Sequence, residues 1–222
     1  MKPPFSIEQF LEVFQSYNLA IWPAQLVAYV LGILAVVLVF RKTRYGDFII
    51  SVVLAIFWLW MGGVYHLAFF TSINAAAYLF GVAFLIQGLL FLIFGCYRHQ
   101  LSFRPERSGY GITGGLLILY AMVIYPLLGA LFGHAYPYAP MFGVAPCPAT
   151  IFTFGLLLWT DKQVPKSLLV IPGLWALVGS TATLFLGVPE DAGLLVAGVA
   201  GMALLLHRDR KKQPAMAPML HG

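Results

Sequence analysis

The most reactive side chain in this 222-residue chain belongs to one of its two cysteines, Cys147. It lies in the sequence Ala-Pro-Cys-Pro-Ala-Thr, where Pro148 suits the first turn of a helix and places Cys147 at or near the N-cap. Backbone N–H groups and the helix dipole stabilise a thiolate at that position, and a thiolate is both a nucleophile and a soft metal ligand. The alternative is a small apolar residue in a tight turn before the helix.

His66, Glu190 and Asp191 are the other reactive side chains that we expect on the same side of the molecule. His66 lies in Val-Tyr-His-Leu, inside an apolar segment, where an ionisable residue is a candidate for function. A histidine hydrogen-bonded to a neighbouring helix is the alternative. Glu190 and Asp191 begin the last apolar segment, where the helix dipole alone favours acids. They could also supply hard ligands or a proton acceptor.

These side chains suggest two kinds of chemistry. Cys147, His66 and Glu190 offer sulfur, nitrogen and oxygen ligands, a set that suits a zinc or copper ion better than magnesium. Cys147 as nucleophile with His66 as base would instead make a membrane-embedded enzyme, which requires the two side chains within hydrogen-bonding distance. The chain has no HExxH, HxxxH, CxxC, Walker or GxSxG motif, so it gives no positive sign of an ATPase, serine hydrolase or zinc protease.

Three further polar residues, Asn74, Thr150 and Gln87, complete the site that we predict. Each has a structural alternative: a turn or cap for Asn74, a bond to a backbone carbonyl for Thr150, and an interhelical hydrogen bond for Gln87. His134, in the loop before Cys147, is interpreted as a solvated loop residue.

Membrane-spanning helices must position these residues. The chain is 61% hydrophobic and only 9% charged, whereas about a quarter of a soluble domain is charged. Its apolar segments predict an all-α, polytopic bundle of seven spans. We place the spans at residues 22–40, 48–70, 75–97, 112–132, 148–160, 168–186 and 189–206.

The distribution of Lys and Arg predicts the orientation of this bundle. All of them except Lys2 fall in alternate gaps between the spans, and basic loops stay cytoplasmic, so the N-terminus is predicted outside and the C-terminus inside. The net charge of +5 belongs to these loops, and we do not expect nucleic acid as a partner. The cations are Arg41, Lys42, Arg44, Arg98, Arg104, Arg107, Lys162, Lys166, Arg208, Arg210, Lys211 and Lys212.

The ends of the chain are predicted to differ from its centre. Residues 1–19 are an interfacial amphipathic helix, since Ser6 and Gln9 fit a capping box and apolar residues follow at helical spacing. Its polar face is acidic, which favours packing over the protein's own outer mouth rather than over lipid. Residues 20–207 form the seven-span domain, and residues 208–222 are a basic cytoplasmic tail without predicted structure.

The span at 148–160 is too short to cross a membrane alone. Its length is about 20 Å, against about 30 Å of hydrocarbon core. The uncharged, proline-rich segment 133–148 before it is predicted to dip inward, which is tolerated only where backbone is buried in protein or lines a wet cavity. We therefore expect an outward-facing vestibule with its floor near Cys147. A span that continues to Val164 is the alternative.

Glycines at regular spacing predict close helix packing. Gly81, Gly88 and Gly95 recur every seven residues, and Gly111 with Gly115 forms a GxxxG pair. Packing within the chain is one interpretation. A seam for a homodimer or for a partner membrane subunit is the other.

Three segments together carry a family resemblance: WLWMGGVYHLAFFTSINAAAYLFG, PCPATIFTFGLLL and GVPEDAGLLVAGVAG. They resemble a bacterial family of small multi-spanning inner-membrane proteins classed as a domain of unknown function. The resemblance implies a multi-pass protein of the bacterial inner membrane and implies no activity. The segments contain His66, Cys147, Glu190 and Asp191.

Three functions remain open on this basis. The convergence of reactive side chains on the outer face favours a small-solute or metal-ion transporter or binding protein. An accessory or assembly subunit of a membrane complex is the second hypothesis. An enzyme that uses Cys147 is the third.

Overall fold

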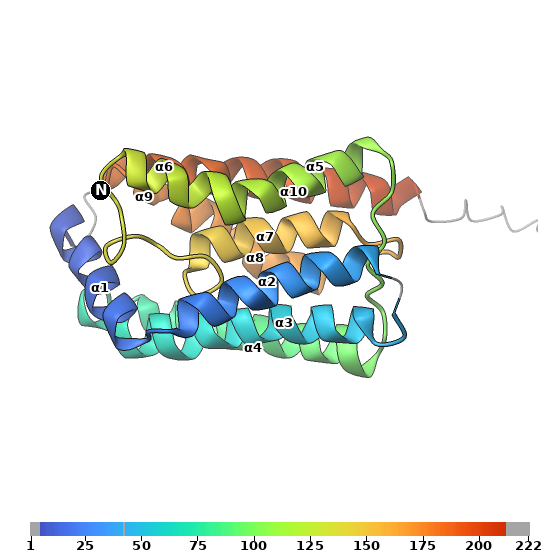
Figure 1. Cartoon of the computed structure of the whole chain (residues 1–222), viewed down its shortest axis with the longest axis horizontal. Helices are drawn as coiled ribbons and strands as arrows, with labels where there is room; N and C mark the ends of the chain where they lie inside the picture. Colours follow the sequence, from blue (N-terminus) through green and yellow to red (C-terminus); the bar gives the residue numbers. More distant parts are fainter. Residues whose placement is uncertain (1–4, 42, 212–222) are drawn as a thin grey trace, which may run out of the picture.

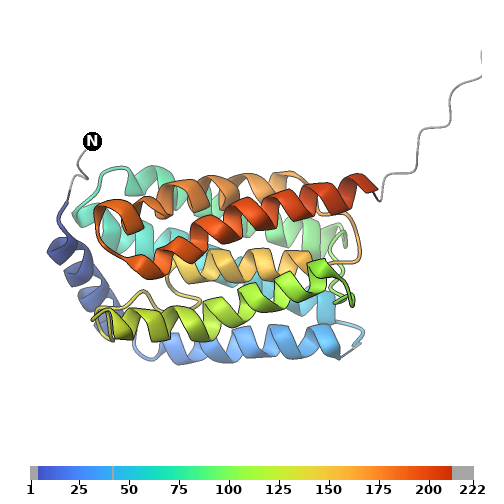
Figure 2. The ribbon, with the colours of Figure 1, turned by 90° about the horizontal axis from the view of Figure 1, so that it is seen from above.

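The computed structural model describes residues 5–41 and 43–211. Two of the cations used to predict the orientation, Lys42 and Lys212, lie outside the described residues, as do Lys2 and most of the basic tail. Within the described part the fold is all-α, without a β-strand, and one isolated bridge joins Phe103 to Thr160. The long helices lie side by side along the long axis of the molecule (Figures 1 and 2).

Several of these helices change from α to π geometry along their length. The longest is α3, which continues through the π-helix η1 and the short 3₁₀-helix η2. In chain order the elements are α1 (Ile7–Ala20), α2 (Ala24–Phe40), α3 (Gly46–Trp60), η1 (Met61–Phe69), η2 (Phe70–Ser72), α4 (Ala77–Phe91), η3 (Leu92–Tyr97), α5 (Gly109–Leu119), η4 (Tyr120–Ile124), α6 (Tyr125–Leu131), α7 (Pro146–Leu158), α8 (Ser167–Gly179), α9 (Thr181–Phe185), η5 (Pro189–Asp191) and α10 (Ala192–Lys211).

Four helical segments of the described chain are long and apolar enough to cross a membrane, and five if α1 and α2 count as one bent span. The four are Gly46–Ser72, Ala77–Tyr97, Gly109–Leu131 and Pro189–Lys211, while α1 and α2 meet at 85°. The remaining predicted spans are shorter apolar helices: α2 alone, Pro146–Leu158 and Ser167–Thr183.

Helix α7 is short because it lies inside the bundle rather than at its surface. All of its residues are buried, and it packs against α3, α5, α8 and α10 (Figures 1 and 2). A helix that is apolar all round is a buried helix. It starts at Pro146 and ends at Leu158, so the span does not continue to Val164.

The segment before α7 turns into the bundle and fills the space above this helix, as predicted. Its Phe142 is 1% exposed and packs against Tyr29, Phe57 and Phe152. Gly143 has a φ of +75°, and a Cβ there would lie 2.8 Å from the Cβ of Ala28. The turn inward therefore depends on glycine, which adopts positive φ at little cost.

Helix α1 lies across one end of the bundle (Figure 1). The predicted capping box is confirmed, because Ser6 and Gln9 exchange hydrogen bonds. The apolar face of α1 is buried, and Tyr17 Oη donates to the carbonyl oxygen of Val144 at 2.7 Å. The helix thus covers the protein's own end and keeps its acidic face outward.

The glycines of α4 and η3 contact the preceding helix of the same chain. A Cβ on Gly88 would lie 2.5 Å from Leu59, and one on Gly81 would lie 2.5 Å from Leu67. A Cβ on Gly95 would lie 2.2 Å from the Oγ of Ser51. This glycine face is therefore used within the chain.

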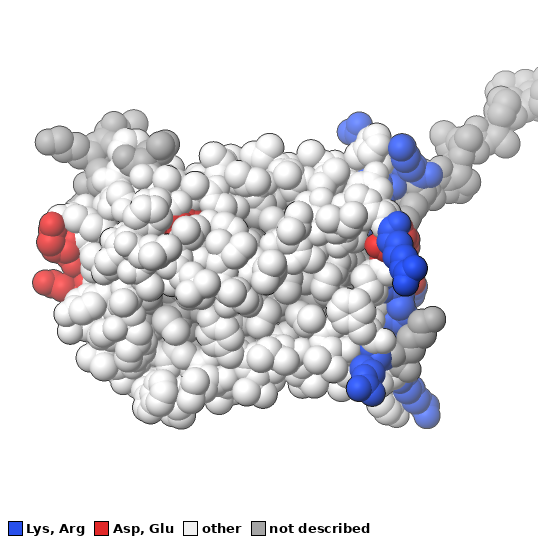
Figure 3. Space-filling model, turned by 45° about the horizontal axis from the view of Figure 1, so that its top comes forward, with Lys and Arg blue, Asp and Glu red and all other residues white. Residues whose placement is uncertain are grey.

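Charge is divided between the two ends of the molecule. In the face shown in Figure 3, the Lys and Arg side chains gather at the end opposite α1, together with a few acids, and the α1 end carries acids. Asp47 Oδ1 accepts from Arg104 Nη1 at 3.0 Å and from the backbone N–H of Phe103 at 2.9 Å, which ties the first turn of α3 to the loop before α5 at the basic end.

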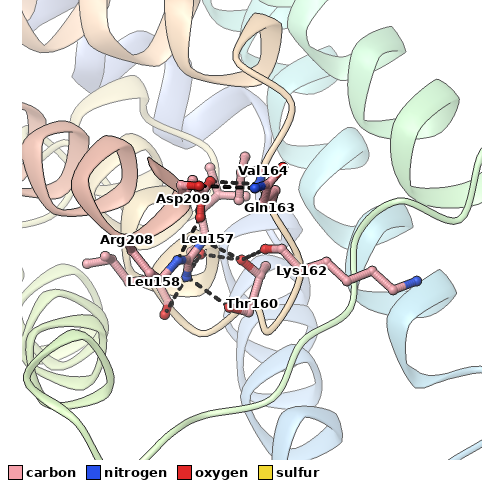
Figure 4. Close-up of polar contacts among 8 residues, drawn as sticks. All are labelled: Leu157, Leu158, Thr160, Lys162, Gln163, Val164, Arg208 and Asp209. Atoms are coloured by element: carbon pink, nitrogen blue, oxygen red, sulfur yellow. Dashed lines mark hydrogen bonds and ion pairs between the residues drawn. The ribbon is translucent and has the colours of Figure 1, made fainter. Parts of the chain in front are cut away.

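The predicted basic tail begins inside α10, because residues 208–211 form its last turn. Arg208 is 4% exposed and donates to the carbonyl oxygens of Leu157, Leu158 and Thr160 at the end of α7 (Figure 4). Asp209 pairs with Arg208 Nε at 2.9 Å and accepts from the backbone N–H of Val164. A cation at a helix C-terminus satisfies carbonyls that lack partners in the helix.

Candidate functional site

A cavity of about 360 Å³ lies at the α1 end of the bundle. Its wall comes from α1, η1, η2, the start of α4, the loop before α7, the start of α7, α8, α9 and η5. Most of the wall is aromatic or aliphatic; Phe10, Phe14, Phe70 and Phe80 are among its residues. A cavity thus lies beside Cys147, and its wall is mostly apolar, whereas the sequence predicted a polar vestibule there.

Cys147 and Asp191 both line this cavity and bring α7 and η5 together. The N-cap of α7 is Ala145, so Cys147 is the second residue of the helix, two positions further in than the predicted N-cap site. Its thiol lies beside the Asp191 carboxylate and the Trp175 indole, and Trp175 also lines the cavity. The dipole of α7 points its positive end at this group of side chains.

Asp191 is fully buried and only partly hydrogen-bonded. Tyr125 Oη donates to Asp191 Oδ1 at 2.5 Å. Asp191 Oδ2 has no hydrogen-bond partner among the described residues. A buried carboxylate oxygen without a donor is costly, and such a group in a native protein calls for a ligand, an ion or water.

Glu190 is also fully buried, but it contacts other residues than Asp191 does. Its Oε1 lies 2.9 Å from Nδ1 of His134, and its backbone carbonyl accepts from Tyr120 Oη at 2.8 Å. His134 is 8% exposed and is therefore not the solvated loop residue that the sequence suggested. His134 directly follows the turn at Gly133, which has a φ of +90°, and its backbone N–H donates to the carbonyl oxygen of Gly129 at 2.7 Å, which keeps it against the end of α6. Glu190 does not line the cavity.

His66 lies behind the cavity wall, enclosed by aromatic rings. The ring centroids of Phe84 and Trp175 are 4.6 and 5.1 Å from that of His66. His66 is fully buried, and neither ring nitrogen has a hydrogen-bond partner in the part of the chain that the structure describes. It lies in the π-helix η1, and π-helical turns occur often at functional sites. Among the described residues, His66 therefore makes no hydrogen bond to a neighbouring helix, which is the alternative interpretation of this histidine.

The other three predicted site residues, Asn74, Thr150 and Gln87, do not lie together in one site. Asn74 lines the rim of the cavity, and its Oδ1 accepts from the backbone N–H of Ala76 at 3.0 Å. Thr150 Oγ1 donates to the carbonyl oxygen of Pro146, and Gln87 Nε2 donates to that of Leu168. Thr150 and Gln87 therefore make the backbone contacts given as their alternatives, and neither lines the cavity.

The predicted metal ligands do not form a metal-ligating group. Within residues 5–41 and 43–211, no three His, Cys, Asp or Glu side chains are placed to hold an ion, so Cys147, His66 and Glu190 do not meet as a set. The same described residues show no hydrogen bond between Cys147 and His66. The geometry thus supports neither the zinc or copper site nor the cysteine–histidine pair.

Tyr65, Tyr125 and Trp175 are the site residues that sequence reasoning missed. Each is a large apolar residue with one polar atom in an otherwise apolar helix, which is a weak signal because such residues are common in membrane spans. Tyr65 lies in the π-helix η1, Tyr125 directly follows the π-helix η4, and Trp175 lies on α8, so three separate helical segments bring them to Cys147 and Asp191.

Comparison with protein families places the chain in a family. The model of a family of unknown function, DUF6064, covers residues 7–215. The chain belongs to this family. The match includes every helix and all of the cavity wall except Phe5. No curated protein and no solved structure matches the chain.

Proposed function

We propose that this member of the DUF6064 family is a multi-pass protein of the bacterial inner membrane with seven spans, its α1 end outside and its C-terminus inside. Four helices of sufficient length support this, together with the shorter apolar helices α2, α7 and α8 beside them. The gathering of Lys and Arg at the end opposite α1 supports the orientation.

The topology is tested with single cysteines at exposed positions in a Cys96→Ser, Cys147→Ser background. Ser16→Cys on α1 should react with a membrane-impermeant maleimide in intact cells, and Lys211→Cys should react only after lysis. The reverse pattern would overturn the orientation.

We propose further that the cavity binds a small, mostly apolar solute that carries one cationic or hydrogen-bond-donating group. The observation that supports this is Asp191 Oδ2, which has no hydrogen-bond partner among residues 5–41 and 43–211 and is buried in the wall of an aromatic cavity of about 360 Å³. Aromatic faces attract organic cations, and the carboxylate provides the charge that such a cation needs. Mostly apolar pockets with few polar groups are typical small-molecule sites.

The structure is better suited to binding than to an open passage. Below the floor of the cavity, Trp58 Nε1 donates to Thr153 Oγ1 at 3.0 Å, and the interior around α7 is filled by aromatic side chains such as Phe152 and Phe154. Transport of the solute would therefore require movement of α7 or of the loop above it. The accessory role is less well supported, since the glycine face of α4 is already occupied by α3 and η1.

Protection of Cys147 from alkylation tests the proposal in purified protein. Choline and its neutral carbon isostere serve as probes, and Cys96, at the opposite end, is the internal control. We expect choline to slow alkylation of Cys147, the isostere to slow it less, and neither to affect Cys96. Equal protection by both probes would show that the positive charge of choline does not contribute to binding. Absence of protection by either would overturn binding in this cavity.

A further inference from the structure

A second cavity, of about 640 Å³, lies at the basic end of the molecule. It is formed by residues after η3, by the connection between α7 and α8, and by the last turn of α10. Three exposed cations line it, namely Lys162, Lys166 and Arg210. The acid in its wall, Asp209, is already paired with Arg208. The cavity therefore has a surplus of positive charge.

An apolar groove of about 500 Å³ begins where this basic cavity ends. The groove runs between α8 and α10, and Leu206 lies in the walls of both hollows. Gly173 and Gly198 allow the two helices to approach, since a Cβ on Gly198 would lie 2.2 Å from that of Ala176. The exposed side chains along it, such as Val199, are aliphatic.

Both helices present the same order of side chains to this continuous surface. On α8, Lys166 is followed by Val170, Gly173 and Leu177 at intervals of three or four residues, which is one helix face. On α10, Arg210 is followed at the same intervals by Leu206, Met202, Val199 and Leu195. At 1.5 Å per residue, the stripe from Lys166 to Leu177 is about 16 Å long, about half of a 30 Å hydrocarbon core. The groove thus has the depth of one leaflet.

We propose that this composite surface is a binding site for one anionic phospholipid, with its phosphate among Lys162, Lys166 and Arg210 and an acyl chain in the α8–α10 groove. Charge complementarity selects the occupant. An anionic headgroup gains from all three cations, whereas a zwitterionic headgroup brings its own cation among them. The apolar groove requires a chain attached to that headgroup, which a soluble phosphate lacks.

Native mass spectrometry of the full chain in detergent tests the site. Phosphatidylglycerol and phosphatidylcholine with identical acyl chains are added separately, and glycerol phosphate is the chain-free probe. We expect selective retention of phosphatidylglycerol. Each cation of the site replaced by Gln should weaken binding about fivefold, if a cation near an anionic surface contributes about 1 kcal/mol.

Matched variants separate the site from general surface charge. The triple variant Lys162→Gln, Lys166→Gln, Arg210→Gln is compared with Arg41→Gln, Arg44→Gln, Arg98→Gln, which removes three exposed cations from the same end outside the cavity. Val199→Trp fills the groove, and Val196→Trp places the same side chain on an exposed position of α10 outside it.

Loss of phosphatidylglycerol in the first triple variant and in Val199→Trp, with retention in both controls, would establish the site. If the two triple variants lose phosphatidylglycerol equally, or if the protein retains phosphatidylcholine as well as phosphatidylglycerol, the lipid is held by non-specific attraction and the proposed site is overturned. Competition by glycerol phosphate at the concentration of the lipid would overturn the role of the groove. Thermal unfolding of each variant checks that the fold is retained.

Discussion

Tyr125 donates a hydrogen bond of 2.5 Å to Asp191 and thereby joins α6 to the start of the last helix at the floor of the aromatic cavity. Tyr125 is 1% exposed and Asp191 is fully buried, so their hydrogen bond is shielded from the solvent outside the bundle. We expect Tyr125→Phe to lower the free energy of unfolding by about 1–3 kcal/mol, because it leaves the carboxylate without its donor. Denaturant or thermal unfolding in detergent measures this.

Tyr78→Phe provides the matched control for the loss of a hydroxyl. Tyr78 lies on α4 and is 63% exposed. This variant should be unchanged within about 0.5 kcal/mol. Equal effects of the two variants would show that the contact between Tyr125 and Asp191 does not stabilise the fold.

The two neighbouring acids should differ in their effect on ligand binding. Asp191 lines the cavity, whereas Glu190 contacts His134 and Tyr120. Asp191→Asn should weaken the protection of Cys147 by choline about tenfold or more, since a hydrogen bond or contact to a charged group contributes about 1.5–3 kcal/mol. Glu190→Gln should leave that protection within about twofold. If Glu190→Gln is the more damaging variant, the binding group has been assigned to the wrong acid.

Arg208 should be a structural residue rather than a surface charge. It donates to three carbonyl oxygens and to Thr160 Oγ1 at the end of α7. Arg208→Met should destabilise the protein by about 3 kcal/mol, because the carbonyls lose a charged donor. Arg210→Met, which removes an exposed cation two residues later, should be close to neutral in unfolding experiments. Similar melting temperatures for the two variants would contradict the capping role.

The local features of the fold could be predicted because their causes lie within a few residues. The capping box needs only Ser6 and Gln9, and the inward turn before α7 follows from a short apolar segment preceded by prolines. The placement of Cys147 and Asp191 at the same end of the bundle follows likewise from their positions at the starts of apolar helical segments. These inferences depend on spacing, which the sequence contains directly.

The partners within the site could not be predicted, because they depend on how distant helices rotate and bend. His66 and Cys147 are both at the predicted outer side, yet the aromatic rings of Tyr65 and Trp175 enclose the histidine. Tyr125 reaches Asp191 only after the π-helical stretch of η4. In the sequence, Arg208 is one of several cations after the last apolar segment and is interpreted as part of a basic tail. Its burial depends on where α7 ends, because its partners are the carbonyl oxygens at that end.

Two glycines on adjoining elements offer a test of whether the glycine face serves the chain itself. A Cβ on Gly88 would lie 2.5 Å from Leu59 Cγ and 3.1 Å from the carbonyl oxygen of Ala55, whereas a Cβ on Gly63 meets nothing within 4 Å among the described residues. Gly88→Ala should therefore lower the stability of the monomer by about 1–3 kcal/mol through overpacking. Gly63→Ala should be neutral or slightly stabilising, because alanine favours the helix. The measurement is the unfolding of each variant at several protein concentrations. A loss for Gly88→Ala that is independent of concentration supports packing within the chain. A loss that grows on dilution would place the glycine face at an interface between copies or with a partner subunit.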